Sequence, residues 1–352
     1  MERDSTDDLL AQVREAATRG VALSIVGGDT KRFYGRAVEG VPLATRGHTG
    51  ILRHDPAELV LTARGGTPLA EVETQLAAHG QRLSFEPPHF GPGATLGGTV
   101  AAGLAGPARA WAGPLRDYVL GARILTGDGR VLRFGGEVMK NVAGYDVARL
   151  MAGSLGVLGV LLDVSLKVLP RAAAERTLAL ELDEAQALEH LASLARGALP
   201  LSASSWIGGR LYLRFEGSTE TLDAVTARVG GEPLPDCGCF WASLREQTHP
   251  FFAGEQSLWR CTVPGLVAPL SLGGAPLVEW NGMQRWYRGV ADAAAFEAAA
   301  AVGGHTTLFR HHTDAAEVFT PLAPPLLRLH RELKRVFDPA GILNPGRMYA
   351  GL

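Results

Sequence analysis

Residues 153–170 read GSLGVLGVLLDVSLKVLP, and this stretch decides the fold. Three glycines stand three residues apart at its start, Gly153, Gly156 and Gly159. Apolar residues then alternate with their neighbours, as in a strand: Val160, Leu162, Val164, Leu166 and Val168. Glycine weakens regular structure by about 0.5–1 kcal/mol relative to alanine. Glycines at the mouth of an apolar strand therefore predict a sharp bend, or the close approach of another backbone or of a ligand.

The composition limits the class of protein. The chain has 352 residues, of which 46% are hydrophobic and 20% charged, as is typical of a soluble globular protein. This length predicts about two domains. The net charge of −2 gives no general attraction to nucleic acid or anionic lipid. Three cysteines, Cys237, Cys239 and Cys261, are too few for a disulfide framework and indicate a reducing compartment.

No metal site and no membrane span is expected. Cys237 and Cys239 form C-x-C without a second pair at zinc spacing. The first residues, MERDSTDDLL, lack the basic and apolar regions of a signal peptide. The longest uncharged run, residues 261–278, contains three prolines and three glycines, which exclude a spanning helix. The expected location is the cytoplasm, with any membrane contact peripheral, at the inner face of the cytoplasmic membrane.

Capping signals predict two helices in the first half. Ser5 or Thr6 is expected to cap a helix that Gly20 closes. Thr67 and Pro68 are expected to be the N-cap and the first residue of another helix.

Further along, a hairpin and a second type of domain are expected. Residues 118–126 and 131–134 flank a Gly-Asp-Gly turn, which predicts two paired strands. Beyond residue 170, helices at 184–196 and 219–229 alternate with short strands such as 210–215. This alternation is typical of a small α+β unit.

The chain is expected to end with one amphipathic helix and an irregular tail. The helix stops at Asp338-Pro339, as the restriction on residues before proline predicts. One face is expected to be apolar and the other basic and solvated. The apolar face comprises Leu326, Leu329, Leu333 and Phe337, and the basic face Arg328, Arg331, Lys334 and Arg335.

Two more glycine-rich loops carry candidate binding chemistry. In GGDTKRFYG, residues 27–35, successive backbone N–H groups could converge on an anion beside Lys31, although a simple turn remains an alternative. In GATLGG, residues 93–98, small residues would let a planar ligand lie against the backbone, with Thr95 as a hydrogen-bond donor. A tight helix contact is the alternative here. Neither loop is a Walker A or Rossmann fingerprint. Three such places together indicate a long ligand with a diphosphate.

These motifs, in this order, carry a family resemblance. GGDTK, GATLGG, NVAGYD, GSLGVLGV and FDPAGILNPGRMY resemble the FAD-binding fold of the p-cresol methylhydroxylase (PCMH) and vanillyl-alcohol oxidase superfamily. More narrowly, FEPPHFGPGATLGG, GLAGPARAWAGPLRDYVLG, RFGGEVMKNVAGYDVARLMAGSLG and NPGRMY look like the E-subunit family of bacterial glycolate oxidases, or glycolate dehydrogenases. The resemblance implies an α+β fold: a PCMH-type FAD-binding domain of two subdomains (1–170), a small α+β cap (171–320) and a C-terminal segment that returns to the FAD domain (321–352).

The resemblance also implies non-covalent FAD and its contacts. His89 is the nearest candidate for a covalent tether. The pyrophosphate loop matches Gly27, Gly28, Asp29, Thr30 and Lys31. The segment beside the flavin and its phosphates matches Gly93, Thr95, Leu96, Gly97, Gly98 and Gly103. The third loop, which serves the adenosine half, matches Gly153, Ser154, Gly156, Leu158, Gly159 and Val160. In the tail, Asn344 is expected at the polar edge of the flavin or against a neighbouring loop.

The catalytic side is less defined. Related D-type subunits and D-lactate dehydrogenases carry a motif resembling H-x-G-D-G-N-x-H in the cap, which this sequence lacks. His311 and His312 are neighbours, so on a strand they would face opposite sides and could not easily share a metal ion. His305 is the better candidate to approach the flavin. The resemblance implies an FAD-binding subunit of a glycolate (2-hydroxy acid) dehydrogenase, with a D-type flavoprotein and an iron–sulfur F-type subunit as partners. An accessory FAD-binding scaffold and a standalone D-lactate-type dehydrogenase remain as alternatives.

Overall fold

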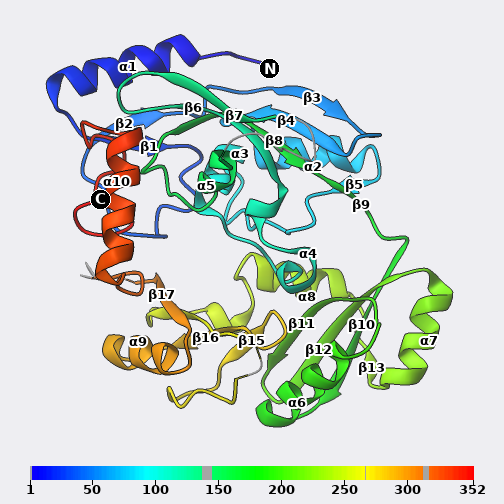
Figure 1. Cartoon of the computed structure of the whole chain (residues 1–352). Helices are drawn as coiled ribbons and strands as arrows, with labels where there is room; N and C mark the ends of the chain where they lie inside the picture. Colours follow the sequence, from blue (N-terminus) through cyan, green and yellow to red (C-terminus); the bar gives the residue numbers. More distant parts are fainter. Residues whose placement is uncertain (1, 137–144, 266, 312–316) are drawn as a thin grey trace. The chain divides into compact units, whose positions relative to one another are not determined.

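The structure is a computed structural model that describes residues 2–136, 145–265, 267–311 and 317–352. It divides into two compact units (Figure 1). Unit 1 comprises Met1–Leu104, Pro114–Pro170 and Pro321–Leu352. Unit 2 comprises Ala105–Gly113 and Arg171–Thr320. Most of the NVAGYD motif, residues 141–144, lies outside the described residues.

Unit 1 is built on two sheets. The larger is antiparallel with the order β3-β4-β8-β6-β7, and a parallel pair, β1-β2, stands apart from it. The bounds are β1 Leu23–Val26, β2 Val41–Ala44, β3 Ile51–Asp55, β4 Val60–Arg64, β6 Val119–Leu125, β7 Val131–Gly135 and β8 Val160–Lys167, with a short pair of β5 Gln81–Arg82 and β9 Leu169–Pro170.

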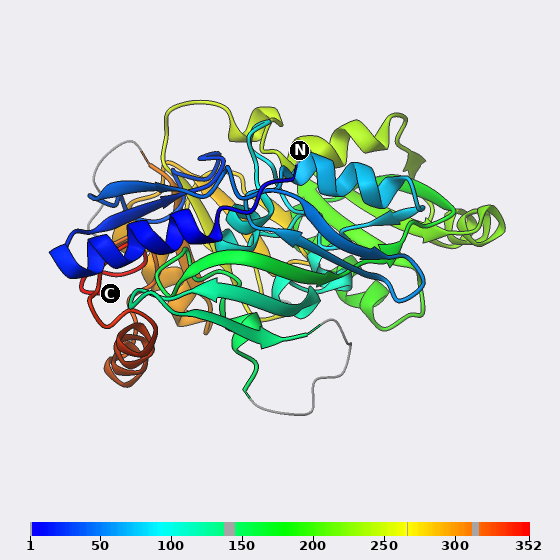
Figure 2. The ribbon, with the colours of Figure 1, turned by 90° about the horizontal axis from the view of Figure 1, so that it is seen from above.

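The apolar strand that follows Gly159, β8, is the central strand of the larger sheet. In β8 every residue but the last is buried, because β4 and β6 flank it and helices cover it. α1 (Thr6–Arg19) packs its Leu9 and Val13 into one cluster with Val160 and Leu162 of β8 (Figure 2). The predicted hairpin is confirmed, since β6 and β7 pair antiparallel around the Gly-Asp-Gly turn.

Two capping predictions need correction. Gly20 does close α1 in the left-handed conformation, with φ 63°. At the other end, Ser5 is the N-cap residue, as expected, but its side chain makes no capping hydrogen bond; Asp4 instead accepts from the Thr6 amide at 2.9 Å. Before α2 (Leu69–Ala77), Pro68 occupies the N-cap position and not the first helical position.

Unit 1 is completed by short helices and the C-terminal helix: α3 Leu96–Ala102, the 3-10 turn η1 Leu115–Tyr118, α5 Val147–Leu150 and α10 Pro324–Phe337. On α10 the expected division of faces holds only in part. Phe337 is buried, whereas Leu326 and Leu329 are exposed. Lys334, expected on the solvated face, is buried.

Unit 2 is one antiparallel sheet with the order β13-β10-β12-β11-β15-β16-β14-β17. Its strands are β10 Ala174–Glu181, β11 Leu201–Ile207, β12 Arg210–Gly217, β13 Glu232–Pro233, β14 Leu258–Thr262, β15 Leu277–Glu279, β16 Gln284–Arg288 and β17 His305–Arg310. Its helices are α4 Arg109–Ala112, α6 Glu184–Ala195, α7 Thr219–Val229, α8 Cys237–Arg245, the 3-10 turn η2 Pro250–Phe252 and α9 Asp292–Ala301.

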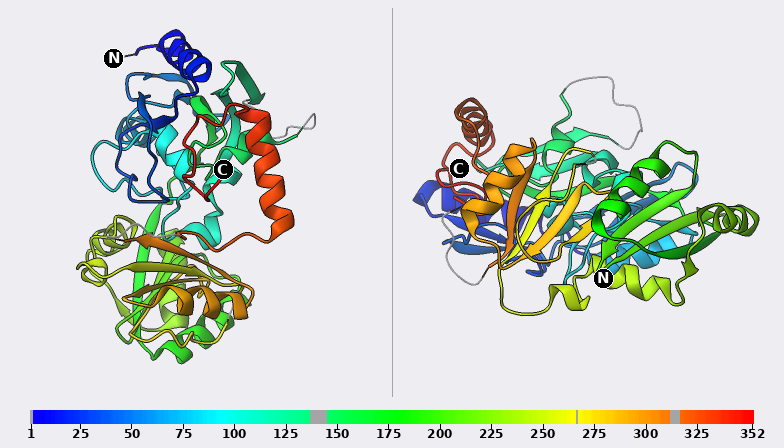
Figure 3. Two further views of the ribbon diagram at one scale, coloured as in Figure 1. Left: turned by 90° about the vertical axis from the view of Figure 1, so that its left-hand side faces the viewer. Right: turned by 90° about the horizontal axis from the view of Figure 1, so that it is seen from below.

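The core of unit 2 lies on one face of its sheet, beneath α6, α7 and α9 (Figure 3). Leu178 of β10 joins the cluster formed with α6 and α7. The neighbouring Thr177 points to the opposite face, because side chains alternate along a strand. There it accepts a hydrogen bond from the Trp241 indole of α8 at 2.8 Å, so α8 covers that second face.

Candidate cofactor site

The loop after β1 offers unused backbone donors. The amides of Gly27, Gly28, Asp29 and Thr30 donate to no backbone carbonyl within the described residues. Asp29 has φ 59°, and a left-handed residue in a turn is typical of loops whose successive N–H groups bind anions. The ammonium group of Lys31 lies 3.2 Å from the carbonyl oxygen of His89. The chemistry of this set, four amides without a backbone acceptor and one lysine beside them, suits an anion such as a diphosphate.

The second glycine loop lies directly against the first. A Cβ on Gly28 would stand 1.5 Å from the carbonyl oxygen of Gly93, and one on Gly27 would stand 2.6 Å from Thr95 Oγ1. Thr95 caps α3 by accepting from the Gly98 amide at 3.2 Å. A hydroxyl group that accepts one hydrogen bond can also donate one, so this contact is compatible with the predicted role of Thr95 as a donor.

The amides that follow Thr95 are already bonded within the protein. Leu96 donates to the carbonyl of Thr67 at 2.9 Å, and Gly97 donates to that of Gly65 at 2.7 Å. A Cβ on Gly97 would stand 2.9 Å from the same Gly65 oxygen. This loop therefore contributes shape and one hydroxyl group rather than a row of free donors.

The third loop runs along α3. The amides of Gly153 and Leu155 donate to Val100 and Ala101 of that helix at 3.0 and 2.9 Å. Gly103, which ends the helix with φ 64°, would place a Cβ 2.8 Å from the Gly153 backbone. Gly159 and Val160 lie where β8 begins to pair with Leu125 of β6. The structure thus brings the predicted residues of all three loops together within unit 1.

Asn344 of the tail joins two of these segments. Its side chain accepts from the Ile25 amide of β1 at 2.7 Å and donates to the Leu155 carbonyl at 2.7 Å. Its residue is buried and has φ 42°. A Cβ on Gly156 would stand 2.7 Å from the Asn344 amide nitrogen. Asn344 is expected either at the polar edge of the flavin or against a neighbouring loop, and these hydrogen bonds place it against neighbouring loops.

These contacts correct the expected reason for the glycines. The glycine spacing alone is compatible with the approach of another backbone or of a ligand, and the family resemblance implies the ligand. At Gly28, Gly97 and Gly103, however, other backbone atoms of the chain already occupy the space of a Cβ. Gly153 is different, because a Cβ there, at φ 81°, would meet nothing within 4 Å. Gly28, Gly97 and Gly103 therefore permit the backbone segments to pack closely, whereas the space beside Gly153 is open.

Two further residues of the C-terminal segment hold the site and were not found from sequence. Arg347 donates to the carbonyls of Arg36 and Arg32 at 2.7 and 2.9 Å, which fastens the tail to the end of the first loop. Lys334 donates to the carbonyl of Val157 at 2.9 Å and pairs with Asp338 at 2.7 Å. Burial lowers the pKa of Lys334, and the hydrogen bond to Asp338 opposes that shift. A lysine in a run of basic residues carries no sequence signal of such burial.

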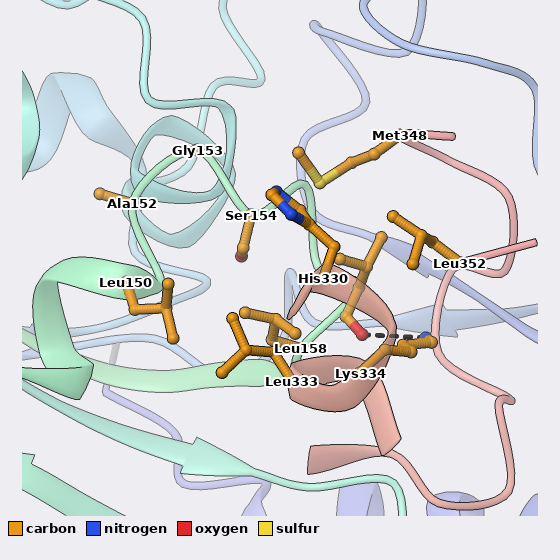
Figure 4. Close-up of a pocket in the computed structure, with 11 residues that line it drawn as sticks. Leu150, Ala152, Gly153, Ser154, Leu158, His330, Leu333, Lys334, Met348 and Leu352 are labelled. Carbon is orange, nitrogen blue, oxygen red and sulfur yellow. Dashed lines mark hydrogen bonds between the residues drawn. The ribbon is translucent and has the colours of Figure 1, made fainter. Parts of the chain in front are cut away.

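A cavity of about 200 Å³ lies between the third loop, α10 and the tail (Figure 4). Ser154 and Leu158 line it from the loop, and His330 and Leu333 from α10. The complete lining is Leu150, Ala152, Gly153, Ser154, Val157, Leu158, His330, Leu333, Lys334, Met348 and Leu352. The walls are mostly apolar, so this hollow suits an apolar group rather than a phosphate.

The candidate histidines belong to different units. His305 begins β17 in unit 2. Partial burial lowers its pKa, and the nearby charges of Arg260 and Arg109 lower it further. His311 follows the end of that strand, and His312 lies outside the described residues. His89 of unit 1 has its Nε2 2.9 Å from a carboxylate oxygen of Glu73.

The described part of the chain holds neither a candidate metal site nor a candidate membrane span. Over the residues that the structure describes, no three His, Cys, Asp or Glu side chains are grouped so as to hold a metal ion. Within the same ranges, no helix has both the length and the apolar character needed to cross a bilayer.

Comparison with known proteins adds independent evidence. Residues 2–135 match the family model "FAD binding domain", and residues 279–348 match "FAD linked oxidases, C-terminal domain". The chain is 46% identical to glycolate oxidase subunit GlcE of Escherichia coli, over 100% of this chain and 99% of that protein. It is 25% identical to a D-lactate dehydrogenase of Archaeoglobus fulgidus, over 98% of this chain and 89% of the other.

Two other matches bear on the fold and on subunit relationships. Glycolate oxidase subunit GlcD of Bacillus subtilis is 32% identical over 36% of this chain and 27% of its own length. Among solved structures, 4-ethylphenol oxidase from Gulosibacter chungangensis superposes with a TM-score of 0.72 at 14% identity, covering 99% of this chain and 89% of that one. At that identity the likeness concerns the fold alone.

Proposed function

The chain belongs to the family of the glycolate oxidase subunit GlcE, among the FAD-linked oxidases of the PCMH superfamily, and from this premise we propose that it is the FAD-binding subunit of a multi-subunit glycolate dehydrogenase. The reaction would convert glycolate, or a similar 2-hydroxy acid, into glyoxylate or the matching keto acid. The observation that carries the proposal is the 46% identity to GlcE across both full lengths.

FAD is the cofactor of this chain. When bound, FAD supplies the two-electron redox chemistry that protein side chains lack. The residues present fit it, because the unused amides of residues 27–30 would hold the diphosphate and Lys31 would balance its charge. Asn344 and Arg347 keep the loops and the tail together. Oxidation of a hydroxy acid also needs a base for the hydroxyl proton. His305, whose lowered pKa keeps its imidazole neutral, is the candidate in unit 2.

We propose that FAD is held without a covalent bond. His89, the nearest candidate tether, has its ring nitrogen engaged with Glu73. Acid precipitation of the purified protein should leave the flavin in the supernatant. Flavin that stays on the protein, and that His89→Ala releases, would contradict this.

The proposed partners are a D-type flavoprotein and an F-type iron–sulfur subunit. Support for the first is that GlcE and GlcD are named as subunits of the same enzyme and that this chain resembles both. The iron–sulfur subunit would carry electrons onward to an acceptor in the membrane, and any membrane association of this chain would be through the complex.

A second candidate function is an accessory FAD-binding scaffold without turnover of its own. It is favoured by the absence of the histidine-rich motif of the D-type relatives. A standalone D-lactate-type dehydrogenase is the third reading, with the Archaeoglobus fulgidus match over 98% of the chain in its favour.

Anaerobic addition of glycolate to the isolated FAD-loaded chain separates these possibilities. Bleaching of the flavin absorbance by glycolate, with D-lactate as comparison, supports a flavin that meets substrate. An unchanged spectrum, together with bleaching of the assembled complex, supports the scaffold. Recovery of a folded protein that takes up no FAD contradicts the proposal itself.

A further inference from the structure

The cavity between the third loop, α10 and the tail adjoins the first loop, whose amides suit a diphosphate. Ser154 and Met348 are part of its lining. The residues next to them in the chain both reach the end of the first loop. A Cβ on Gly35 would stand 3.1 Å from Leu155 Cδ1 and 3.0 Å from the carbonyl oxygen of Arg347. The cavity therefore begins where the first loop ends, on the side toward which a group joined to the diphosphate would extend.

The size and the walls of this cavity suit a flat aromatic base. A dry cavity of about 150 Å³ takes up benzene, which is a single ring. A cavity of about 200 Å³ has room for a second fused ring, as in adenine, but not for the three fused rings of a flavin. Leu158 and Leu333 supply apolar side chains for the faces of a base, and the Met348 thioether suits contact with an aromatic ring. Adenine performs no redox chemistry, so FAD loses no reactivity when this end is enclosed.

His330 places a hydrogen-bond acceptor in the wall of the cavity. Its Nδ1 lies 2.8 Å from the carbonyl oxygen of Leu326. A carbonyl oxygen only accepts, so Nδ1 carries the hydrogen, and Nε2 of the neutral ring is then an acceptor. In Figure 4 the ring lies beside Ser154 and Met348. The exocyclic amino group of adenine donates, whereas hypoxanthine has a carbonyl at the same position, so an acceptor here favours adenine.

We propose that this cavity binds the adenine ring of FAD, with Nε2 of His330 accepting a hydrogen bond from the exocyclic amino group. The apolar side chains of α10 and the tail would pack against the faces of the ring. This inference rests on the proposed function, because it takes the diphosphate of FAD to lie on the first loop. It adds the recognition of the base, and it assigns that role to α10 and the tail, which lie outside the glycine loops.

The first test fills the cavity in the complete chain, after its flavin has been removed. Leu333→Trp puts an indole group into the space of the base, so the dissociation constant of FAD should rise about tenfold or more, the usual scale of overpacking. FMN lacks the adenosine half, and its dissociation constant should not change, which also reports that the variant is folded. The matched control is Leu329→Trp, on the same helix but outside the cavity lining, with an exposed fraction of 55%. That control should bind FAD as the wild type does.

The second test removes only the acceptor. His330→Phe keeps a ring of similar shape, and the probe is the FAD analogue in which hypoxanthine replaces adenine. The wild type should bind FAD about tenfold more tightly than this analogue, the scale of one hydrogen bond, and His330→Phe should lose that preference. The control is His79→Phe, because His79 of α2's C-terminal turn makes the same contact from Nδ1 to the carbonyl four residues before it, that of Gln75, at 3.1 Å. The control should keep the wild-type preference.

Three results would overturn the proposal. An unchanged dissociation constant of FAD in Leu333→Trp would show that the base lies elsewhere. An equal loss of FAD and FMN would show that the cavity holds the flavin ring. Equal binding of FAD and its hypoxanthine analogue by the wild type, or a preference that survives in His330→Phe, would remove His330 from recognition of the base. A folded wild-type chain that binds neither FAD nor FMN would instead count against the proposed function.

Discussion

At the scale of single residues, the site depends on how closely backbone can approach backbone. Gly28 is the tightest case, with a Gly93 carbonyl oxygen where its Cβ would be. Gly28→Ala should therefore separate the first two loops. Overpacking typically costs about 1–3 kcal/mol, and we expect the variant to lose that much stability and most of its FAD.

The control for Gly28→Ala is Gly238→Ala. Gly238 lies within α8, and a Cβ there meets nothing within 4 Å. This change should keep full FAD and leave stability equal or slightly raised, since alanine favours a helix over glycine by about 1 kcal/mol. Thermal unfolding and the ratio of flavin to protein absorbance measure both. Full FAD occupancy in Gly28→Ala would show that the two loops need not touch.

A buried carboxylate should make unit 1 sensitive to acid. Asp163 of β8 is 5% exposed. Burial alone would raise its pKa, but the His48 ring nitrogen 3.4 Å away and the hydrogen bond from Arg123 outweigh burial and lower it. Because the folded pKa is depressed, the stabilisation is present above the unfolded value of about 3.9 and is lost as pH falls through the folded pKa.

Asp163→Asn should abolish that acid-dependent part and cost about 1.5–3 kcal/mol at neutral pH, because Arg123 loses its charged hydrogen-bond partner. Urea unfolding from pH 7 down to pH 3 measures both effects. The difference in stability between wild type and variant should narrow below about pH 4. A constant difference across that range would show that Asp163 does not titrate in the window.

At the scale of elements, local signals predicted local features and missed long-range ones. The β6–β7 hairpin followed from alternation and a Gly-Asp-Gly turn, and both belong to neighbouring residues. The order of strands in unit 2 and the partner of each glycine loop depend on residues far apart in the sequence. Lys334 shows the limit most clearly. Its buried ammonium group donates to the carbonyls of Val157 and Leu343, and no periodicity in α10 predicts these contacts.

The C-terminal tail should control FAD retention more than it controls the cores. Removal of residues 344–352 deletes Asn344, which joins β1 to the third loop, and Arg347, which fastens the first loop. We expect a folded protein that releases its FAD on gel filtration. Asn344→Asp is the sharper variant, because a carboxylate cannot donate to the Leu155 carbonyl.

The measurement for both tail variants is FAD dissociation followed by recovery of flavin fluorescence. A faster release in Asn344→Asp than in wild type is expected. The matched variant Asn281→Asp changes an asparagine of unit 2 whose amide group is not part of the FAD loops, and its release rate should not change. If the truncated and complete chains retained FAD equally, the only role of the tail would be to hold the C-terminus against unit 1.

At the scale of the whole molecule, the sequence separates cofactor binding from substrate turnover. The three glycine loops come together in unit 1 of a chain whose cofactor is FAD, whereas the sequence lacks the histidine-rich motif that the D-type relatives carry. A chain with this division should be saturated with FAD and still be a poor catalyst alone. The remaining groups for proton removal and carboxylate binding would then come from another subunit.

The FAD-loaded chain alone should oxidise glycolate slowly or not at all with a dye as electron acceptor, and the same assay should give turnover when D-type and F-type subunits are co-expressed. The FAD content of the lone chain is the control, because an empty chain would be inactive for a trivial reason. His305→Asn addresses the same point inside the complex. If His305 is a base, the variant should lower kcat and flatten the acid limb of the pH profile; if the D-type subunit performs all turnover, it should change neither. Turnover by the lone chain equal to that of the complex would show that catalysis needs no other subunit. This result would reject both the multi-subunit dehydrogenase and the accessory scaffold as functions, and would favour a complete standalone dehydrogenase.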